Sequence, residues 1–168
     1  MKKMKNDNKG FTLVELIVVL VILAILAAIL VPALLGYIDE AKNKQLELHG
    51  KSVYTAAQAV ASKMYAKNAV PSDDTNKTMD TSKTNKAYFK AEVVKISELS
   101  TFAATASDVK AVITFGSTTD KDKYTVQAVA YTEDGGTTWT KWEKGLWTLQ
   151  TGSWADTDTG SSILVQGS

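Results

Sequence analysis

The chain of 168 residues has no cysteine, no arginine and a single histidine, His49. Without cysteine it cannot form disulfides, thiolate nucleophiles or cysteine-ligated metal sites. One imidazole also excludes, within a single chain, any metal site that needs two histidine ligands. Because every basic residue is a lysine, the bidentate recognition of phosphate or guanine that arginine provides is missing as well. We therefore expect no metal and no cofactor, and His49 is interpreted as a surface or packing residue.

The charges and reactive groups give no sign of catalysis. The formal net charge is +1, so there is no reason to expect a nucleic-acid surface over the whole chain. No nucleophile with a neighbouring base stands out, and we do not expect an enzyme. Asp73, Asp74 and Asp80 lie close together in sequence but do not follow the spacing of an EF-hand loop. A solvated loop is the preferred interpretation of these carboxylates.

The N-terminus carries the densest hydrophobicity of the chain. Four lysines lie in residues 1–10, and residues 16–31 are all apolar. From residue 11 to residue 35 the apolar run is interrupted only by Thr12, Glu15 and Pro32. As a helix this segment would be about 37 Å long, enough to cross the roughly 30 Å hydrocarbon core of a bilayer. The lysines before it predict that the short N-terminus stays cytoplasmic and that the rest of the chain lies outside.

Three simpler interpretations of this segment leave Glu15 unexplained. An ordinary secretory signal peptide has a shorter apolar region, and a plain single-span anchor needs no carboxylate. The rest of the chain is too small to enclose the segment as a buried helix. A carboxylate inside a membrane-spanning run costs about 2.5–3.5 kcal/mol and usually has a partner. Taken alone, Glu15 could equally be an interfacial residue near the cytoplasmic headgroups.

Residues 10–15 have the sequence GFTLVE, follow a short lysine-rich leader and precede the unbroken apolar run. This pattern resembles the N-terminus of type IV prepilins. The resemblance implies cleavage by a prepilin peptidase between Gly10 and Phe11, followed by N-methylation of Phe11. It also implies that Glu15 pairs with the amino group of Phe11 on a neighbouring subunit. Such a pairing agrees with electrostatics, because two opposite charges in a low dielectric are tolerated only together.

The resemblance also implies a domain organisation and a location. Residues 1–10 would be a cleaved leader, residues 11–36 a transmembrane and filament-core helix, and residues 37–168 the globular head. The precursor would be a single-pass protein of the cytoplasmic membrane. With the pilus assembly platform as partner, the processed subunit would join a helical homo-oligomer, an extracellular pilus. Pro32 removes a helical hydrogen bond and Gly36 adds backbone freedom, so we expect a kink or an unwound stretch there.

Beyond the apolar run, the sequence predicts a long helix and an antiparallel sheet. No proline interrupts residues 33–70, and apolar residues at helical spacing in this stretch extend the helix, which starts at residue 11 and is expected to kink near Pro32, to about residue 67. A polar loop follows at 69–86, and a short amphipathic helix at 88–99. Period-two runs separated by turn residues predict strands at 109–115, 124–132, 137–143 and 146–151, with a short last strand at 163–165. The fold class is α+β, with about four strands covered on one face by the second half of the long helix, which is the type IV pilin fold that the resemblance implies.

Two features of the predicted sheet bear on ligands. Residues 132–139 fit the Asp-box pattern, S/T-x-D-x-G-x-T-W, a folding feature of β-hairpins that carries no catalysis. Four tryptophans lie in or after this hairpin, at Trp139, Trp142, Trp147 and Trp154. Packing in a small domain without disulfides is their main interpretation, and an exposed surface for a carbohydrate or host ligand is the alternative. The odd spacing of Trp139 and Trp142 places them on opposite faces of a strand, so at most one is buried against the helix.

The leading hypothesis for function is a structural subunit of a type IV pilus that serves adhesion, motility or DNA uptake. A pseudopilin of a secretion or competence system shares the same N-terminus and is the first alternative. A pilin helix that merely anchors a carbohydrate-binding head is the second. Many pilins of Gram-negative bacteria close a C-terminal loop with a disulfide, and the absence of cysteine here is easier to reconcile with a Gram-positive source.

Overall fold

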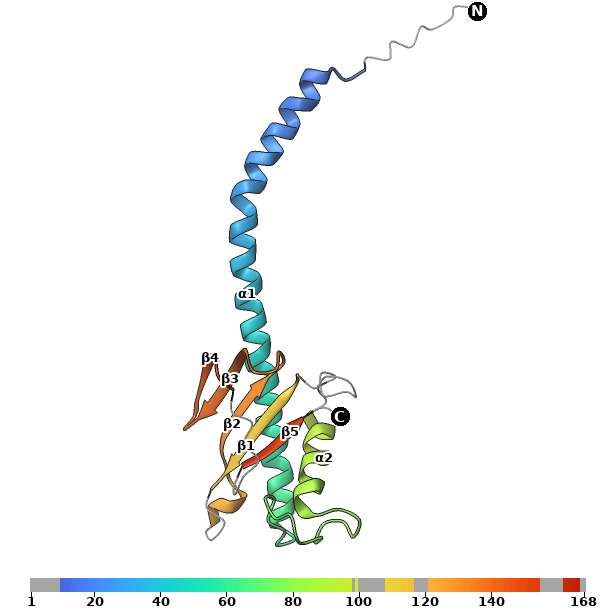
Figure 1. Cartoon of the computed structure of the whole chain (residues 1–168), viewed down its shortest axis with the longest axis vertical. Coiled ribbons are helices and arrows are strands. Elements are labelled where there is room, and N and C mark those ends of the chain that lie inside the picture. Colours follow the sequence, from blue (N-terminus) through green and yellow to red (C-terminus); the bar gives the residue numbers. More distant parts are fainter. Residues whose placement is uncertain (1–9, 98, 100–107, 117–120, 155–161, 167–168) are drawn as a thin grey trace, which may run out of the picture. The chain divides into compact units, whose positions relative to one another are not determined.

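The computed structural model of the chain describes residues 10–97, 99, 108–116, 121–154 and 162–166 (Figure 1). Residues 1–9 of the expected leader therefore lie outside the described residues. The elements in chain order are α1 (Leu13–Tyr65), α2 (Asn85–Ser97), β1 (Lys110–Phe115), the short 3-10 helix η2 (Lys121–Tyr124), β2 (Val126–Thr132), β3 (Thr138–Glu143), β4 (Leu146–Thr151) and β5 (Ser162–Gln166). The chain divides into two compact units, Met1–Lys42 and Asn43–Ser168.

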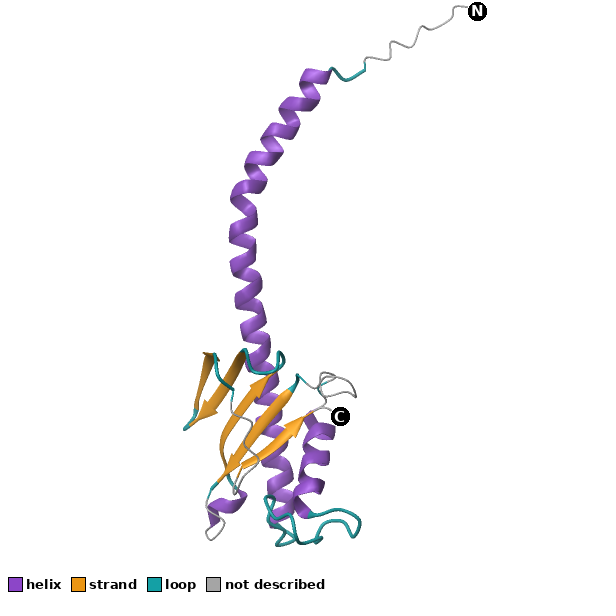
Figure 2. Cartoon of the chain, in the orientation of Figure 1, coloured by secondary structure: helices purple, strands orange, loops and turns teal. Residues whose placement is uncertain are grey.

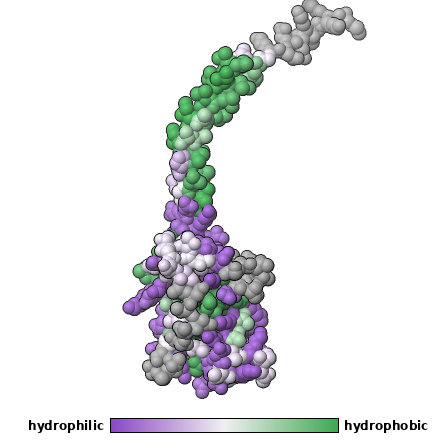
Figure 3. Space-filling view, viewed as in Figure 1, coloured by the Kyte–Doolittle hydropathy of each residue, from purple (hydrophilic) through white to green (hydrophobic). Residues whose placement is uncertain are grey.

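The first unit contains the N-terminal part of α1 and exposes its apolar side chains. The most apolar 18-residue window of the helix has a mean hydropathy of 3.3, and none of that window is buried. Figure 3 shows these side chains as a largely hydrophobic surface, coloured green. By length and composition, α1 is the one helix in the described part of the chain that could cross a membrane. A helix that is apolar on all sides needs lipid or other protein around it.

The first unit stays helical through Pro32 and Gly36 (Figure 2). No unwound stretch interrupts α1 at these residues, and a kink there stays a prediction. Both positions are exposed, and a Cβ added at Gly36 would meet nothing within 4 Å. Packing within this unit therefore does not require glycine at that position.

The ends of both helices are set by capping groups that hydrophobic periodicity does not reveal. The predicted range 11–67 is slightly too long for α1, because Thr12 caps its start and Asn68 adopts a left-handed φ of 57° just after its end. The predicted range 88–99 begins too late for α2. The hydroxyl of Thr84 accepts a hydrogen bond at 3.3 Å from the backbone N–H three residues on, which starts the helix at Asn85.

The second unit contains a five-stranded antiparallel sheet in the order β4-β3-β2-β1-β5. Four strands follow the period-two runs of the sequence, and β5 confirms the short last strand. The hairpin between β3 and β4 turns through Lys144 and Gly145, whose φ values of 52° and 85° are both positive, as a two-residue type I′ turn requires. The long helix with its antiparallel sheet confirms the predicted α+β class and is consistent with a type IV pilin fold.

The second half of α1 covers the sheet with one helix face. Its buried residues, spaced three or four apart or adjacent on one face of the helix, are Leu46, Gly50, Val53, Ala56, Ala57, Val60, Ala61 and Met64. The apolar ones form a single hydrophobic cluster with strand residues such as Ile113, Val129 and Tyr131. Phe89 and Val93 of α2, the helix whose residues contact β5, belong to the same cluster.

Two residues of α1 fix how the helix meets the sheet. Gly50 lies at a close approach, since a Cβ there would lie only 2.7 Å from Cζ3 of Trp147. Gln58 binds the backbone that leads into β2. Its Oε1 accepts a hydrogen bond from Val126 N at 3.0 Å, and its Nε2 donates to Tyr124 O at 3.3 Å. Close packing and these two hydrogen bonds together define the register of helix against sheet.

The loop between α1 and α2 is held by its own polar side chains. Asp73 Oδ1 accepts hydrogen bonds from N and Oγ1 of Thr75, at 2.8 and 2.7 Å, and Asp73 Oδ2 accepts one from Nδ2 of Asn76 at 2.5 Å. The Asn76 side chain first, then Thr75, hold the pKa of Asp73 well below its ordinary range. At the other end of the loop, Asn85 is buried, and its Oδ1 accepts a hydrogen bond from Thr78 N at 2.9 Å.

Candidate functional site

The residues predicted for processing and assembly lie at the N-terminal end of α1. Gly10 and Phe11 precede the helix, and Glu15 lies in its first turn. Phe11 is 87% exposed. Gly10 is exposed too, and a Cβ added there would meet nothing within 4 Å. Because the helix begins only at Leu13, the peptide bond between Gly10 and Phe11 is accessible and not tied into helical hydrogen bonds.

Glu15 is engaged by Thr12 within its own chain. Oε2 of Glu15 accepts hydrogen bonds from both N and Oγ1 of Thr12 at 2.8 Å, and Glu15 N donates to Thr12 Oγ1 at 3.3 Å. This reciprocal arrangement is a capping box, T-x-x-E, which satisfies backbone donors at the start of a helix. Thr12 is thus a site residue that the sequence interpretation passed over, although its spacing of three residues from Glu15 signals it.

The capping box leaves the Glu15 carboxylate able to accept further hydrogen bonds. Both of its hydrogen bonds from Thr12 reach the same oxygen, Oε2. Within the described residues, no cation forms an ion pair with Glu15. A carboxylate has about four lone-pair sites, so Oε1 can accept from a further donor without loss of the helix cap. The geometry therefore suits a carboxylate that serves its own helix and one external positive group.

The four tryptophans are divided between the two faces of the sheet. Trp142 lies against Tyr54 of α1, with ring centroids 4.2 Å apart, and Trp147 lies against Gly50. Trp139 stacks edge-on with Trp154 at 5.5 Å. Because Trp139 and Trp142 are an odd number of residues apart in β3, their side chains point to opposite faces, as the sequence predicts. The four rings therefore do not form one aromatic surface, and only the Trp139–Trp154 pair lies on the face away from α1.

The Asp-box predicted at residues 132–139 is formed. Thr132 Oγ1 donates to Asp134 Oδ1 at 2.9 Å and accepts from Gly136 N at 3.0 Å. Thr138 N donates to both Asp134 oxygens at 3.0 Å. Burial raises the pKa of Asp134, but the hydrogen bonds from Thr138, Thr132 and Gly136 outweigh it and bring the pKa below its ordinary value. The motif closes the β2–β3 hairpin, with Trp154 packed on Gly136.

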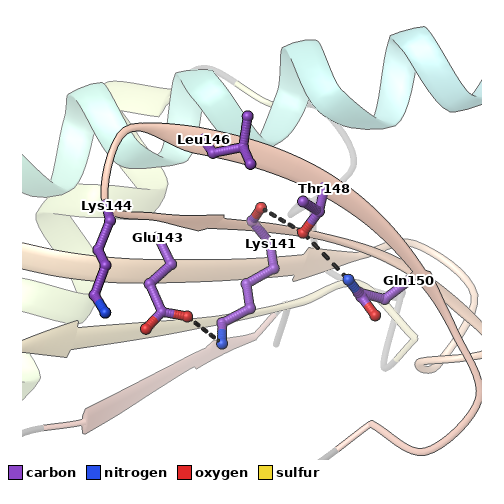
Figure 4. Close-up of a pocket in the computed structure, with 6 residues that line it drawn as sticks. All are labelled: Lys141, Glu143, Lys144, Leu146, Thr148 and Gln150. Atoms are coloured by element: carbon purple, nitrogen blue, oxygen red, sulfur yellow. Dashed lines mark hydrogen bonds and ion pairs between the residues drawn. The ribbon is translucent and has the colours of Figure 1, made fainter.

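A shallow depression of about 480 Å³ lies on the outer face of β3 and β4 (Figure 4). Two of its three charged groups are paired, since Lys141 Nζ lies 2.6 Å from Glu143 Oε2. Its other polar groups are also linked: Gln150 Nε2 donates to Thr148 Oγ1 at 3.2 Å. The lining residues drawn in Figure 4 bring together no nucleophile and base.

His49 has a structural contact that its sequence position does not predict. Its Nδ1 lies 2.5 Å from Oε1 of Glu133, and Tyr131 Oη donates to the same Oε1 at 2.7 Å. His49 belongs to α1 and Glu133 directly follows β2, so the pair joins helix to sheet. Among the described residues there is no group of three His, Cys, Asp or Glu side chains that could hold a metal ion.

A comparison with known protein families gives a match at the N-terminus of the chain. Residues 5–31 match the family model described as the prokaryotic N-terminal methylation motif. No curated protein and no solved structure matches the chain. The matched residues include the Gly10–Phe11 bond, Thr12 and Glu15, and with the exposed apolar helix they fit a membrane-anchored precursor. The chain thus carries the N-terminal signal peptide of a type IV pilin-like or pseudopilin precursor.

Proposed function

We propose that the chain is a non-enzymatic structural subunit of a type IV pilus. It is exported as a membrane-anchored prepilin, cleaved after Gly10 by a prepilin peptidase, N-methylated on Phe11 and polymerised through α1 into a surface filament. The observation that carries this proposal is Glu15 in a methylation motif, at the start of a helix whose apolar window is fully exposed.

The apolar surface of α1 supports polymerisation. Residues such as Leu20, Leu23 and Leu26 are more than half exposed, an arrangement that is stable in lipid but not in water. When the processed subunit leaves the bilayer, this surface must be covered by something equally apolar. Identical helices from other subunits meet that requirement, because each brings the same exposed surface.

Gly10 supports processing by an enzyme. Glycine is needed in a fold where φ is positive or where a neighbour leaves no room for a Cβ. Gly10 has neither property, since its φ is not in the positive range and the space around it is open. The fold therefore does not need a glycine at this position, whereas a peptidase that accepts only a small residue before the cleaved bond would need one.

Glu15 supports ordered assembly. Cleavage after Gly10 would create a positive amino group on Phe11, four residues before the carboxylate. Between subunits these two groups neutralise each other in an environment where neither is tolerated alone. Because such a pair adds little net stability but requires one alignment, we expect it to set the register between neighbouring subunits.

A pseudopilin of a secretion or competence system is the first alternative, since it would share this N-terminus. A head that binds carbohydrate is the second, and the Trp139–Trp154 pair on the outer face of the sheet favours it. Isolation of abundant filaments sheared from cells would separate the pilin from the pseudopilin. Binding to a glycan array that is lost on Trp154→Ala would support the carbohydrate function.

A substitution at Glu15 tests the proposal. Glu15→Ala should reach the membrane fraction in normal amounts but produce few or no surface filaments by negative-stain microscopy. Glu40→Ala is the matched control, because it removes an exposed carboxylate from the same helix outside the motif, and it should leave filaments intact. Wild-type numbers of filaments from Glu15→Ala would show that the carboxylate does not direct assembly.

A further inference from the structure

The loop between α1 and α2 contains the sequence Asn76-Lys77-Thr78, an N-x-T triplet without proline in the middle. This triplet is the acceptor signal for N-linked glycosylation. No other asparagine of the chain is followed two positions later by serine or threonine. We propose that Asn76 is a site of N-linked glycosylation. The proposal rests on the proposed function, because it needs the head to be exported.

The structure places the triplet where a glycosyltransferase could reach it. Asn76, Lys77 and Thr78 are all exposed, and none of them belongs to a helix or strand. By contrast, Asn85 is 1% exposed, although it lies only a few residues away. The acceptor signal therefore coincides with an accessible asparagine and not with the buried one.

The backbone of Asn76 is fixed while its side chain stays at the surface. Its carbonyl oxygen accepts a hydrogen bond from Asn85 N at 2.8 Å, and its N–H donates to Asp73 Oδ1 at 3.1 Å. The Nδ2 group has two hydrogens, and one of them is directed at Asp73 Oδ2, 2.5 Å away. The loop thus presents the amide nitrogen in a defined place, next to a carboxylate that is ionised at neutral pH.

The hydroxyl of Thr78, the third residue of the triplet, is also available. Its Oγ1 is an acceptor for Asn85 Nδ2 at 3.4 Å, a long hydrogen bond, and the residue is exposed. Because a hydroxyl can donate and accept at once, this contact leaves the hydroxyl hydrogen for an enzyme. Thr78→Ser would keep that group, and Thr78→Ala would remove it without touching Asn76.

The chemistry requires a sugar donor, for which we infer a glycan linked to a polyprenyl pyrophosphate in the membrane. Nδ2 of Asn76 forms a bond to the anomeric carbon of the sugar while the bond from that carbon to the pyrophosphate oxygen breaks. The pyrophosphate leaves with the electron pair, and one amide proton passes to a base of the transferase. Nothing is oxidised or reduced.

Mass spectrometry of the subunit purified from its own cells tests the proposal. Digestion after lysine yields a peptide of residues 68–77, or 68–83 if the bond after Lys77 is protected. We expect this peptide to carry a mass that fragments into sugar ions, and electron-transfer fragmentation to place the mass on Asn76. Asn68 lies in the same peptide outside any acceptor signal and should be unmodified, which makes it an internal control.

Variants separate recognition of the triplet from a general effect on the loop. Asn76→Gln and Thr78→Ala should lose the modification completely, and Thr78→Ser should retain it. Thr75→Ala is the matched control, since it removes the hydroxyl hydrogen bond to Asp73 from the same loop but leaves the triplet intact. It should be modified like the wild type.

The same spectra distinguish failure of this proposal from failure of the proposed function. A subunit that starts at Phe11 but carries an unmodified Asn76 would overturn the glycosylation alone. Modification that persists in Thr78→Ala would also overturn it, because the acceptor signal would then not be used. A cell-associated chain that still begins at Met1 and carries no glycan would contradict both.

Discussion

Gly50 faces a space that is too small for any side chain. A Cβ added there would lie 2.7 Å from Cζ3 of Trp147 and 2.8 Å from Cγ2 of Thr140, both shorter than van der Waals contact. Alanine would improve helix propensity by about 1 kcal/mol, but forced displacement of packed side chains costs about 1–3 kcal/mol. We expect Gly50→Ala to lower the free energy of unfolding of the head by up to about 2 kcal/mol net, measured by denaturant unfolding of the full chain in detergent.

Gly36→Ala is the matched control for this prediction. It makes the same change in the same helix, at a position where the new methyl group meets nothing within 4 Å. It should leave the unfolding midpoint of the head unchanged. An unfolding midpoint of Gly50→Ala at or above the wild-type value would contradict the prediction. It would mean that the helix moves away from the sheet at residue 50 with no loss of unfolding free energy.

Asp134 makes the stability of the hairpin depend on pH. Its pKa is lower in the folded chain than the value of about 3.9 expected when unfolded, so the folded state binds fewer protons. Its contribution to stability is fully present above pH 4 and is lost as the pH falls through the folded pKa. The difference in unfolding free energy between wild type and Asp134→Asn should therefore be constant near neutral pH and shrink below pH 4.

Titration of other carboxylates cancels in that difference, because both proteins contain them. A difference that is the same at neutral pH and well below pH 4, or one that grows on acidification, would refute the assigned role of Asp134.

At the scale of elements, His49 and Glu133 join α1 to the end of β2. The atoms Nδ1 and Oε1 lie 2.5 Å apart, and both side chains are partly exposed, at 23% and 29%. Solvent reduces the value of a hydrogen bond to a charged group, so we expect a coupling energy of about 1 kcal/mol. A double-mutant cycle with His49→Ala and Glu133→Ala, read out as unfolding free energy, measures it.

The control cycle pairs His49→Ala with Glu47→Ala. Glu47 lies on the same helix but bonds to Lys51, at 2.6 Å, and not to His49. Its coupling to His49 should be close to zero. Equal coupling in the two cycles would show that the His49–Glu133 contact adds nothing specific.

Elements with strong periodicity could be predicted from the sequence, and their ends could not. The strands follow the alternation of apolar and polar residues that a half-buried sheet imposes. The turn at Lys144 and Gly145 could be predicted because glycine readily adopts the positive φ that such a turn needs. The helix starts depend on hydrogen bonds that the hydroxyls of Thr12 and Thr84 accept from backbone N–H groups, and these bonds leave no mark on hydrophobic spacing. The contact of His49 with Glu133 joins residues distant in sequence, and only the three-dimensional packing brings them together.

For the whole molecule, the N-terminal site could be predicted because its residues are contiguous. Gly10, Phe11 and Glu15 lie within one short motif, and the structure adds Thr12 as the partner that holds Glu15 in the single chain. The surfaces of the head are less predictable. The four tryptophans are close in sequence, yet their distribution over both faces of the sheet depends on strand register and on the path of the chain after β4.

The N-terminus of the exported subunit, determined by mass spectrometry of surface filaments sheared from cells, decides whether the chain is processed and assembled as a pilin. We predict a chain that begins at Phe11 and carries one methyl group on its amino nitrogen, because cleavage after Gly10 creates the amine with which Glu15 is expected to pair. A filament subunit that still begins at Met1, or one that begins well beyond Phe11 and so lacks Glu15, would contradict it.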